Sequence, residues 1–214
     1  MPKTVVIDAL SPDPQVIKQA AGLIVQGRVL VCPTDTGYAF AASAVDTRAV
    51  ARVFELKGRA YSNPIHVAVN SVEEARKYAQ VNKAAEQLAR HFLPGALTMV
   101  LPRKETIPPL LVSGRDTVGI RIPDNRAMLE LAALTGRPIT ATSANISGQP
   151  TPYDVEEIRK QMGKAIRGVA LILDQGTLPS RELSTIVDLT VSPPRLIRQG
   201  RVSWLEIRQV LQSL

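Results

Sequence analysis

The sequence is poor in the side chains that bind metals or act as thiol nucleophiles. Its 214 residues include one cysteine, Cys32, and two histidines, His66 and His91. A single cysteine cannot form an internal disulfide, which fits a reducing compartment. These three side chains cannot supply an ordinary zinc site, so we predict no metal held by protein ligands. A structural role is the default expectation for both histidines.

Long apolar runs are also missing. No stretch approaches the roughly 18 consecutive apolar residues that a membrane span requires. The first residues, Met1 to Thr4, lead directly into a short apolar run that Asp8 closes, which is not the pattern of a signal peptide. We therefore expect a cytoplasmic protein without a membrane partner. Because only 4% of the residues are aromatic, Val, Ile, Leu and Ala must form most of the core.

Several well-known catalytic signatures are absent. The sequence contains no G-x-x-x-x-G-K-[ST] phosphate loop, no G-x-G-x-x-G fingerprint and no G-x-S-x-G nucleophile elbow. If the protein is an enzyme, we therefore expect it to work without a histidine base, a thiol or a zinc ion.

Basic residues outnumber acidic ones. There are 26 Lys and Arg against 19 Asp and Glu, which gives a formal net charge of +7. A basic surface favours anionic partners, either nucleic acid or phosphorylated small molecules, although the same excess can serve solubility alone. No run of five or more Lys and Arg occurs, so we predict no basic tail.

Short apolar strands alternate with amphipathic helices along the chain. This alternation is typical of an α/β domain. Polar caps at helix starts and glycines at helix ends mark several boundaries. The expected strands are 4–8, 28–33, 64–69, 97–101, 117–122, 138–142, 169–173 and 185–189. The expected helices are 12–26, 46–58, 82–92, 125–135 and 154–162, with a short helix after Ser71 and a last one from Ser203.

Four segments combine an apolar strand or a helix end with a loop of small polar residues. They span 31–38, 56–64, 117–123 and 141–148, and the pattern returns at Ser184-Thr185 and Arg198-Gln199-Gly200. Ligands of open α/β sheets bind at strand ends. A polar turn would explain each segment alone, but their number favours a binding site.

Charged residues in two of these segments have two interpretations each. Lys57 and Arg59 follow a helix, where they either complement the helix dipole or reach a phosphate chain. Thr117, Gly119 and Arg121 share one strand face, and the glycine leaves room beside the arginine. For the strand 117–122, a cavity beside Arg121 and an ordinary strand with one face in solvent are about equally good interpretations.

Taken together and in chain order, these segments resemble the motifs of the YrdC family. The resemblance covers about residues 15–200. The matching pieces are Pro33-Thr34-Asp35-Thr36, Lys57-Gly58-Arg59, Asn63-Pro64, Pro94-Gly95-Ala96-Leu97-Thr98, Thr117 with Arg121-Ile122-Pro123, Ser143-Ala144-Asn145 with Ser147-Gly148, Ser184-Thr185-Ile186-Val187-Asp188, and Arg198.

The resemblance implies a fold and a reaction. The expected fold is a single α/β domain over residues 1–214, with a twisted, mostly mixed open sheet flanked by helices around a large positively charged cleft. Longer family members carry an additional C-terminal domain, which we do not expect in a chain that ends at Leu214. The expected reaction joins L-threonine, bicarbonate and ATP into threonylcarbamoyl-adenylate and pyrophosphate. A tRNA-modifying transferase complex would then transfer the threonylcarbamoyl group to tRNA.

The resemblance also implies a set of site residues. Thr36, Arg121, Ala141 and Ser184 would contact threonine or its carbamate. ATP would be held by Arg59, Asn63, Thr117, Ser143, Thr151 and Arg198, with Lys57 and Asn145 supporting its phosphates. Lys57, Arg59 and Arg121 would be catalytic, since this chemistry needs two anions in line and the charge of the leaving pyrophosphate neutralised. Mg²⁺ would be carried by the phosphates of ATP, which is a substrate.

Some positions depart from the family pattern and keep alternatives open. Gly37-Tyr38-Ala39 is more similar to the YciO branch, and Ala68 stands where many members have a histidine, two residues after His66. One alternative is therefore a YciO-like paralogue with weak or different nucleotide chemistry. Another is an RNA-binding module that grips tRNA or double-stranded RNA through phosphates. The irregular segment 102–116 is either a lid or a plain surface loop.

Overall fold

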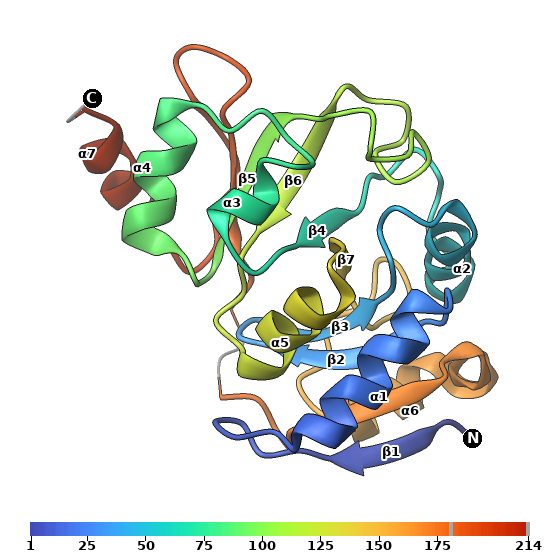
Figure 1. Cartoon of the computed structure of the whole chain (residues 1–214). Helices are drawn as coiled ribbons and strands as arrows, with labels where there is room; N and C mark the ends of the chain where they lie inside the picture. Colours follow the sequence, from blue (N-terminus) through green and yellow to red (C-terminus); the bar gives the residue numbers. More distant parts are fainter. Residues whose placement is uncertain (180–181, 213–214) are drawn as a thin grey trace.

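The computed structural model describes residues 1–179 and 182–212, which form one ten-stranded sheet with helices around it (Figure 1). The strands are β1 (Lys3–Val6), β2 (Leu30–Thr34), β3 (Gly37–Ala41), β4 (His66–Ala68), β5 (Leu97–Pro102), β6 (Thr117–Arg121), β7 (Ile139–Ser143), β8 (Leu171–Asp174), β9 (Thr185–Asp188) and β10 (Arg195–Arg198). The helices are α1 (Pro14–Val25), α2 (Thr47–Lys57), α3 (Val72–Ala75), α4 (Lys83–Phe92), α5 (Arg126–Thr135), α6 (Val155–Met162), the 3-10 helix η1 (Gly163–Gly168) and α7 (Trp204–Gln212).

The sheet is open and mixed, which confirms the predicted fold class. Its strand order is β1-β8-β2-β3-β7-β4-β6-β5-β9-β10. The pairs β1–β8, β2–β8, β4–β6 and β5–β9 are parallel, and the other neighbours are antiparallel. Strand β7 lies in the middle, paired with β3 on one side and β4 on the other. Residues from distant parts of the chain therefore meet at the centre of the sheet.

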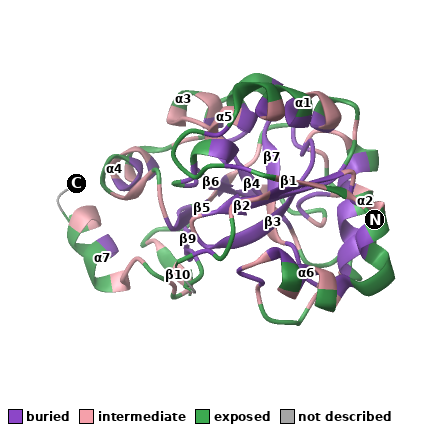
Figure 2. Cartoon of the chain, turned by 90° about the horizontal axis from the view of Figure 1, so that it is seen from below, coloured by how far each residue is buried: buried purple, intermediate pink, exposed green. Residues whose placement is uncertain are grey.

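Helices cover both faces of the sheet. Figure 2 shows α1, α3 and α5 on one side of the strands and α6 on the other, while α4 and α7 lie together at the β9–β10 end. The strands carry many of the buried residues in that view. Throughout the described residues, no helix has both the length and the apolar character needed to cross a membrane.

Polar caps and glycines bound the helices as the sequence predicts. The Asp46 carboxylate accepts from the amides of Arg48 and Ala49 at the start of α2, and Gly58 ends that helix in the left-handed region with φ of 55°. Asn125 and Gly136 do the same for α5. Caps of this kind satisfy amides and carbonyls that have no partner inside the helix. The end of α2 thereby places Lys57 and Arg59 at a fixed point beside the sheet.

Two strands were not predicted from the sequence. Gly37–Ala41 forms β3, a hairpin partner of β2, where we expected a loop of small polar residues after the strand 28–33. Tyr38 and Phe40 are fully buried and alternate with alanines, so this strand has large side chains on one face and small ones on the other. Strand β10, Arg195–Arg198, was also missed; it pairs with β9 across an irregular register.

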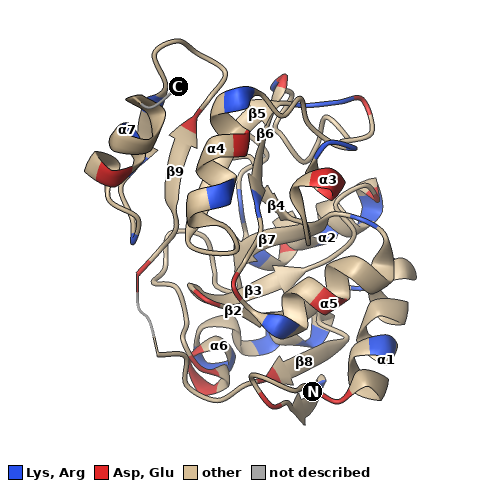
Figure 3. Cartoon of the chain, turned by 60° about the vertical axis from the view of Figure 1, so that its left-hand side comes forward, with Lys and Arg blue, Asp and Glu red and all other residues tan. Residues whose placement is uncertain are grey.

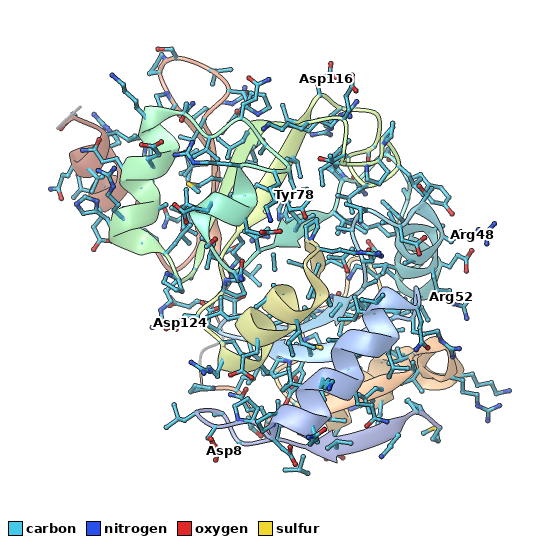
Figure 4. The ribbon with its side chains drawn as sticks, in the orientation of Figure 1. Asp8, Arg48, Arg52, Tyr78, Asp116 and Asp124 are labelled. Carbon is cyan, nitrogen blue, oxygen red and sulfur yellow. The ribbon has the colours of Figure 1, made fainter. Side chains whose placement is uncertain are left out.

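Segment 102–116 is anchored to the body of the protein. Ile107, Leu111 and Val112 are buried in the main core, and the Ile65 amide donates to the Leu111 carbonyl. No residue from 103–116 lines the central cavity described below. Asp116, at the far end, points outward (Figure 4). The structure therefore favours the surface-loop interpretation over the lid.

Candidate functional site

A cavity of about 280 Å³ opens at the centre of the sheet. It is bordered by the β2–β3 hairpin, the end of α2, strands β4 to β7, the loop after β7, and the β9–β10 hairpin. Ten of the twelve predicted site residues line it: Thr36, Lys57, Arg59, Arg121, Ala141, Ser143, Asn145, Thr151, Ser184 and Arg198. The structure thus brings together residues that lie up to about 160 positions apart.

Arg121 enters the cavity from the end of β6 and is firmly held. Its Nη1 donates to Thr36 Oγ1 at 2.5 Å, its Nη2 to Asp35 Oδ1 at 2.5 Å, and its Nε to the Gly95 carbonyl at 3.1 Å. Both side chains of the Arg121–Asp35 ion pair are at most 10% exposed. The guanidinium fork is therefore preorganised beside the Thr36 hydroxyl, and Asp35 offsets the charge that Arg121 buries.

Lys57 is buried and turned into the protein. Its Nζ donates to Asn145 Oδ1 at 2.6 Å, to the Asn145 carbonyl at 3.2 Å, and to the Ser143 carbonyl. Burial, with a smaller effect of the nearby Arg59 charge, lowers the pKa of Lys57 to about 7. Lys57 therefore fixes the loop after β7. The sequence led us to expect that Lys57 supports the phosphates of ATP. In the structure, the N–H donors of Lys57 already bond to Ser143 and Asn145.

The Asn145 side chain makes several hydrogen bonds that hold the loop after β7 together. Its Oδ1 accepts from both Lys57 and the Ser143 hydroxyl, and its Nδ2 donates to the carbonyls of Gln149 and Pro150. An asparagine side chain that makes this many bonds to its own loop fixes the backbone around it. The loop presents Ser143 and Thr151 to the cavity.

Arg59 and Arg198 reach the cavity from different elements, the end of α2 and the end of β10. Arg59 donates to the carbonyls of Asn63 and Pro64, and Arg198 donates twice to the Ser184 carbonyl and once to the Ser184 hydroxyl. Within the described residues, Nη1 of each guanidinium has no protein acceptor, so donors remain for a ligand. Burial lowers the pKa of both groups, and the charge of Arg121 adds to the effect at Arg198.

His66 is a cavity residue that the sequence analysis did not include in the site. It sits on β4 between Ala141 of β7 and Gly119 of β6, and a Cβ at Gly119 would come within 2.5 Å of the ring. Burial, followed by the charges of Arg198, Arg59 and Arg121, lowers the pKa of His66 to about 4. The imidazole is therefore neutral at pH 7. As predicted, Gly119 leaves space beside the strand, but the His66 ring, and not a ligand, fills that space.

Asn63 and Thr117 do not line the cavity. Asn63 contributes only its carbonyl, which holds Arg59. Thr117 shares a strand face with Arg121 but lies four residues away, or about 13 Å along the strand. The alternation of residues along β6 predicted which face of the strand points to the site. It could not predict how many residues of that face reach the cavity.

The charges that line the cavity have one sign. Arg59, Arg121 and Arg198 contribute cations, Lys57 adds an amine that is partly protonated at pH 7, and no Asp or Glu is among the described lining residues. In the described part of the chain, no three His, Cys, Asp or Glu side chains come together as metal ligands. The cavity therefore matches a ligand with several negative charges.

A second hollow of about 600 Å³ adjoins the cavity at Gln149 and Thr151. Ile146, Pro150 and Tyr153 give it an apolar surface, with Glu157, Lys160 and Gln161 around them. Charged and apolar halves side by side suit a ligand with both an anionic chain and a flat apolar ring.

Comparisons with known proteins show which family this chain resembles and which solved structures share its fold. The family model Sua5/YciO/YrdC, described as telomere recombination, matches residues 22–200. The threonylcarbamoyl-AMP synthase of Pyrococcus abyssi is 40% identical over 200 residues, which are 92% of this chain and 58% of that relative. The structure of P. abyssi Sua5 complexed with L-threonine superposes with a TM-score of 0.90 at 37% identity, covering 97% of this chain and 61% of the other.

A second solved structure, of a protein about as long as this chain, also matches. Escherichia coli YciO superposes with a TM-score of 0.86 at 28% identity, covering 95% of this chain and 98% of YciO. This chain thus spans about three fifths of its Pyrococcus relatives and matches nearly all of YciO.

Proposed function

The chain belongs to the Sua5/YciO/YrdC family, and from that premise we propose that it is a threonylcarbamoyl-AMP synthase. It would form threonylcarbamoyl-adenylate and pyrophosphate from L-threonine, bicarbonate and ATP. We further propose that it acts in the cytoplasm, with a tRNA-modifying transferase complex as the user of its product. The observation that carries the proposal is the cavity that brings Arg121 and Thr36 together with Arg59 and Arg198.

The two halves of the cavity suit the two organic substrates. The Arg121 fork beside Thr36 suits an amino acid, because a guanidinium pairs with a carboxylate through two parallel bonds, and Ser184 lines the same cavity. The unused donors of Arg59 and Arg198 suit the phosphates of ATP, with Ser143 and Thr151 on the loop that Lys57 holds. The adenosine would extend past Thr151 into the second hollow.

The proposed reaction requires little covalent help from the protein. The amino nitrogen of threonine attacks the carbon of bicarbonate, and loss of water gives a carbamate. A carbamate oxygen then attacks the α-phosphorus of ATP, and the bond to the bridging oxygen breaks with its electron pair going to pyrophosphate. Arg59 and Arg198 neutralise the charge that develops on the leaving group. Arg121 and Thr36 hold the carbamate in line with the bond that breaks.

A YciO-like activity on a nucleotide is the second candidate. The match to YciO covers both chains almost completely, and Gly37-Tyr38-Ala39 is more similar to that branch than to the synthases. Under this candidate the ATP half of the cavity is used, but threonine is not the acyl substrate.

Threonine-dependent release of pyrophosphate from ATP, with bicarbonate and Mg²⁺, separates the two candidates. We expect release by the wild type and a loss of about 10- to 100-fold in kcat/KM for threonine in Arg121→Lys, which keeps the charge but not the fork. The matched control is Arg48→Ala, because Arg48 lies on the outer side of α2, away from the cavity (Figure 4). ATP binding without threonine-dependent release would reject the synthase in favour of the YciO-like activity.

RNA binding is a separate question for the same chain. Lys and Arg residues are spread over several helices and loops of the ribbon and do not gather on one element (Figure 3). Such a distribution does not by itself define a groove for a phosphate backbone.

A further inference from the structure

The segment Pro94–Thr98 has no assigned role, although it is among the motifs that identify the family. It connects α4 to β5 and reaches the cavity at Thr98, which is 1% exposed. Two of its residues contact groups placed in the amino-acid half of the site. Gly95 contacts Arg121, and Thr98 contacts Ser184.

Gly95 supports Arg121 through its backbone. Its carbonyl accepts from Arg121 Nε at 3.1 Å, and its amide donates to the Ile122 carbonyl at 2.8 Å. A Cβ at this position would lie 2.5 Å from the Phe92 carbonyl oxygen, so only glycine fits without movement. The segment is therefore tied both to the Arg121 side chain and to the backbone of the next residue, Ile122.

Thr98 is the side chain that meets the Ser184 hydroxyl. Its Oγ1 lies 3.0 Å from Ser184 Oγ, and Arg198 Nη2 lies 3.1 Å from the same oxygen. A guanidinium can only donate, so Ser184 Oγ accepts the bond from Arg198. The single proton of Ser184 then goes either to Thr98 or to a ligand in the cavity.

The direction of the Thr98 bond decides between these two cases. If Thr98 donates, Ser184 Oγ accepts twice and its proton points to the cavity, where it can bond an oxygen of the amino acid. If Thr98 accepts, the Ser184 proton is used up within the protein. We propose that Thr98 is a positioning residue that donates to Ser184 and so turns the Ser184 proton toward the amino-acid substrate. This inference rests on the proposed function.

A loss of the Thr98 hydroxyl should affect one substrate and spare the other. Arg198 is held mainly by two bonds to the Ser184 carbonyl, which do not involve Thr98. The ATP side of the cavity should therefore stay in place when Thr98 changes. The loss should appear in the KM for threonine, as expected for the removal of one oriented hydrogen bond.

The experiment measures KM for threonine and KM for ATP in the wild type, Thr98→Val and Thr98→Ser. We expect Thr98→Val to raise KM for threonine about five- to tenfold with KM for ATP unchanged, and Thr98→Ser to restore it. The control is Thr135→Val, which removes a buried threonine hydroxyl at the end of α5, outside the cavity. It should leave both KM values unchanged.

The outcomes separate the inference from the function on which it rests. A wild type without threonine-dependent pyrophosphate release would overturn the proposed function and this inference with it. An active wild type whose Thr98→Val variant keeps its KM for threonine would overturn the inference alone. So would an equal rise in both KM values, or a Thr98→Ser variant that fails to recover, because either result would mean that Thr98 only fills space.

Discussion

The buried histidine of the cavity makes a quantitative prediction about acid stability. The pKa of His66 falls from 6.5 to about 4 on folding. Above pH 6.5 the imidazole is neutral in both states. Between pH 6.5 and 4 the unfolded chain binds a proton that the folded chain does not, so the free energy of unfolding decreases as the pH falls through this window. At about 1.4 kcal/mol for each pH unit, the loss from this group amounts to about 3 kcal/mol.

The substitution His66→Gln isolates this contribution, because glutamine does not titrate. Other groups that titrate in the same window affect both proteins and cancel in the difference. We expect urea denaturation to show that the wild type loses about 3 kcal/mol more than His66→Gln between pH 7 and pH 4. Identical pH dependence in the two proteins would refute the reasoning. So would an NMR titration that places the pKa of His66 near 6.5.

The cause of the shift can be tested with a ligand. After burial, the charges of Arg198, Arg59 and Arg121 are what lower the pKa of His66. Pyrophosphate bound among these arginines would offset their charge, so the pKa of His66 should rise when it binds. A pKa that stays the same at saturating pyrophosphate would mean that the anion binds elsewhere.

Three further substitutions test how the cavity is held together. Lys57→Met should lower the free energy of unfolding by about 3 kcal/mol in urea denaturation, because it leaves acceptor oxygens of Ser143 and Asn145 without their donor. Gly119→Ala should cost about 1–3 kcal/mol by pushing on the His66 ring, and combining it with His66→Ala should recover most of that cost in a double-mutant cycle. Arg121→Ala should cost about 3–5 kcal/mol because it leaves Asp35 buried without a partner, and adding Asp35→Asn should recover most of it; a double variant no more stable than Arg121→Ala would contradict the pairing.

Local sequence signals predicted the fold class and most element boundaries. Asp46, Asn125 and the glycines after their helices act within one turn of the residues they cap, so their effect can be read from neighbouring positions. Strand β3 was missed because Gly37 and two alanines weaken its strand pattern, and only pairing with β2 and β7 makes it a strand. Its second partner, β7, lies about 100 positions further along the chain, so that pairing cannot be read from neighbouring residues.

The family resemblance marked individual residues, ten of which the fold brings to one cavity. The site was not predictable where a residue acts through a distant partner. Thr98 is 86 positions from Ser184, and Asp35 is 86 positions from Arg121. Lys57 shows the converse, because its charge suggested a phosphate contact while the fold gives its donors to Asn145. The type of a residue shows which bonds its side chain can make, and the fold determines which partners it bonds to.

The most direct test of the proposed function is to identify the carbon that enters the product. The wild type is incubated with ATP, Mg²⁺, L-threonine and ¹³C-bicarbonate, and the nucleotides are analysed by mass spectrometry. We predict an adenylate that contains threonine and is one mass unit heavier than the product formed with unlabelled bicarbonate, and that is absent when threonine is omitted. Turnover of ATP to nucleotide products without the label would contradict the proposal that this chain makes threonylcarbamoyl-adenylate.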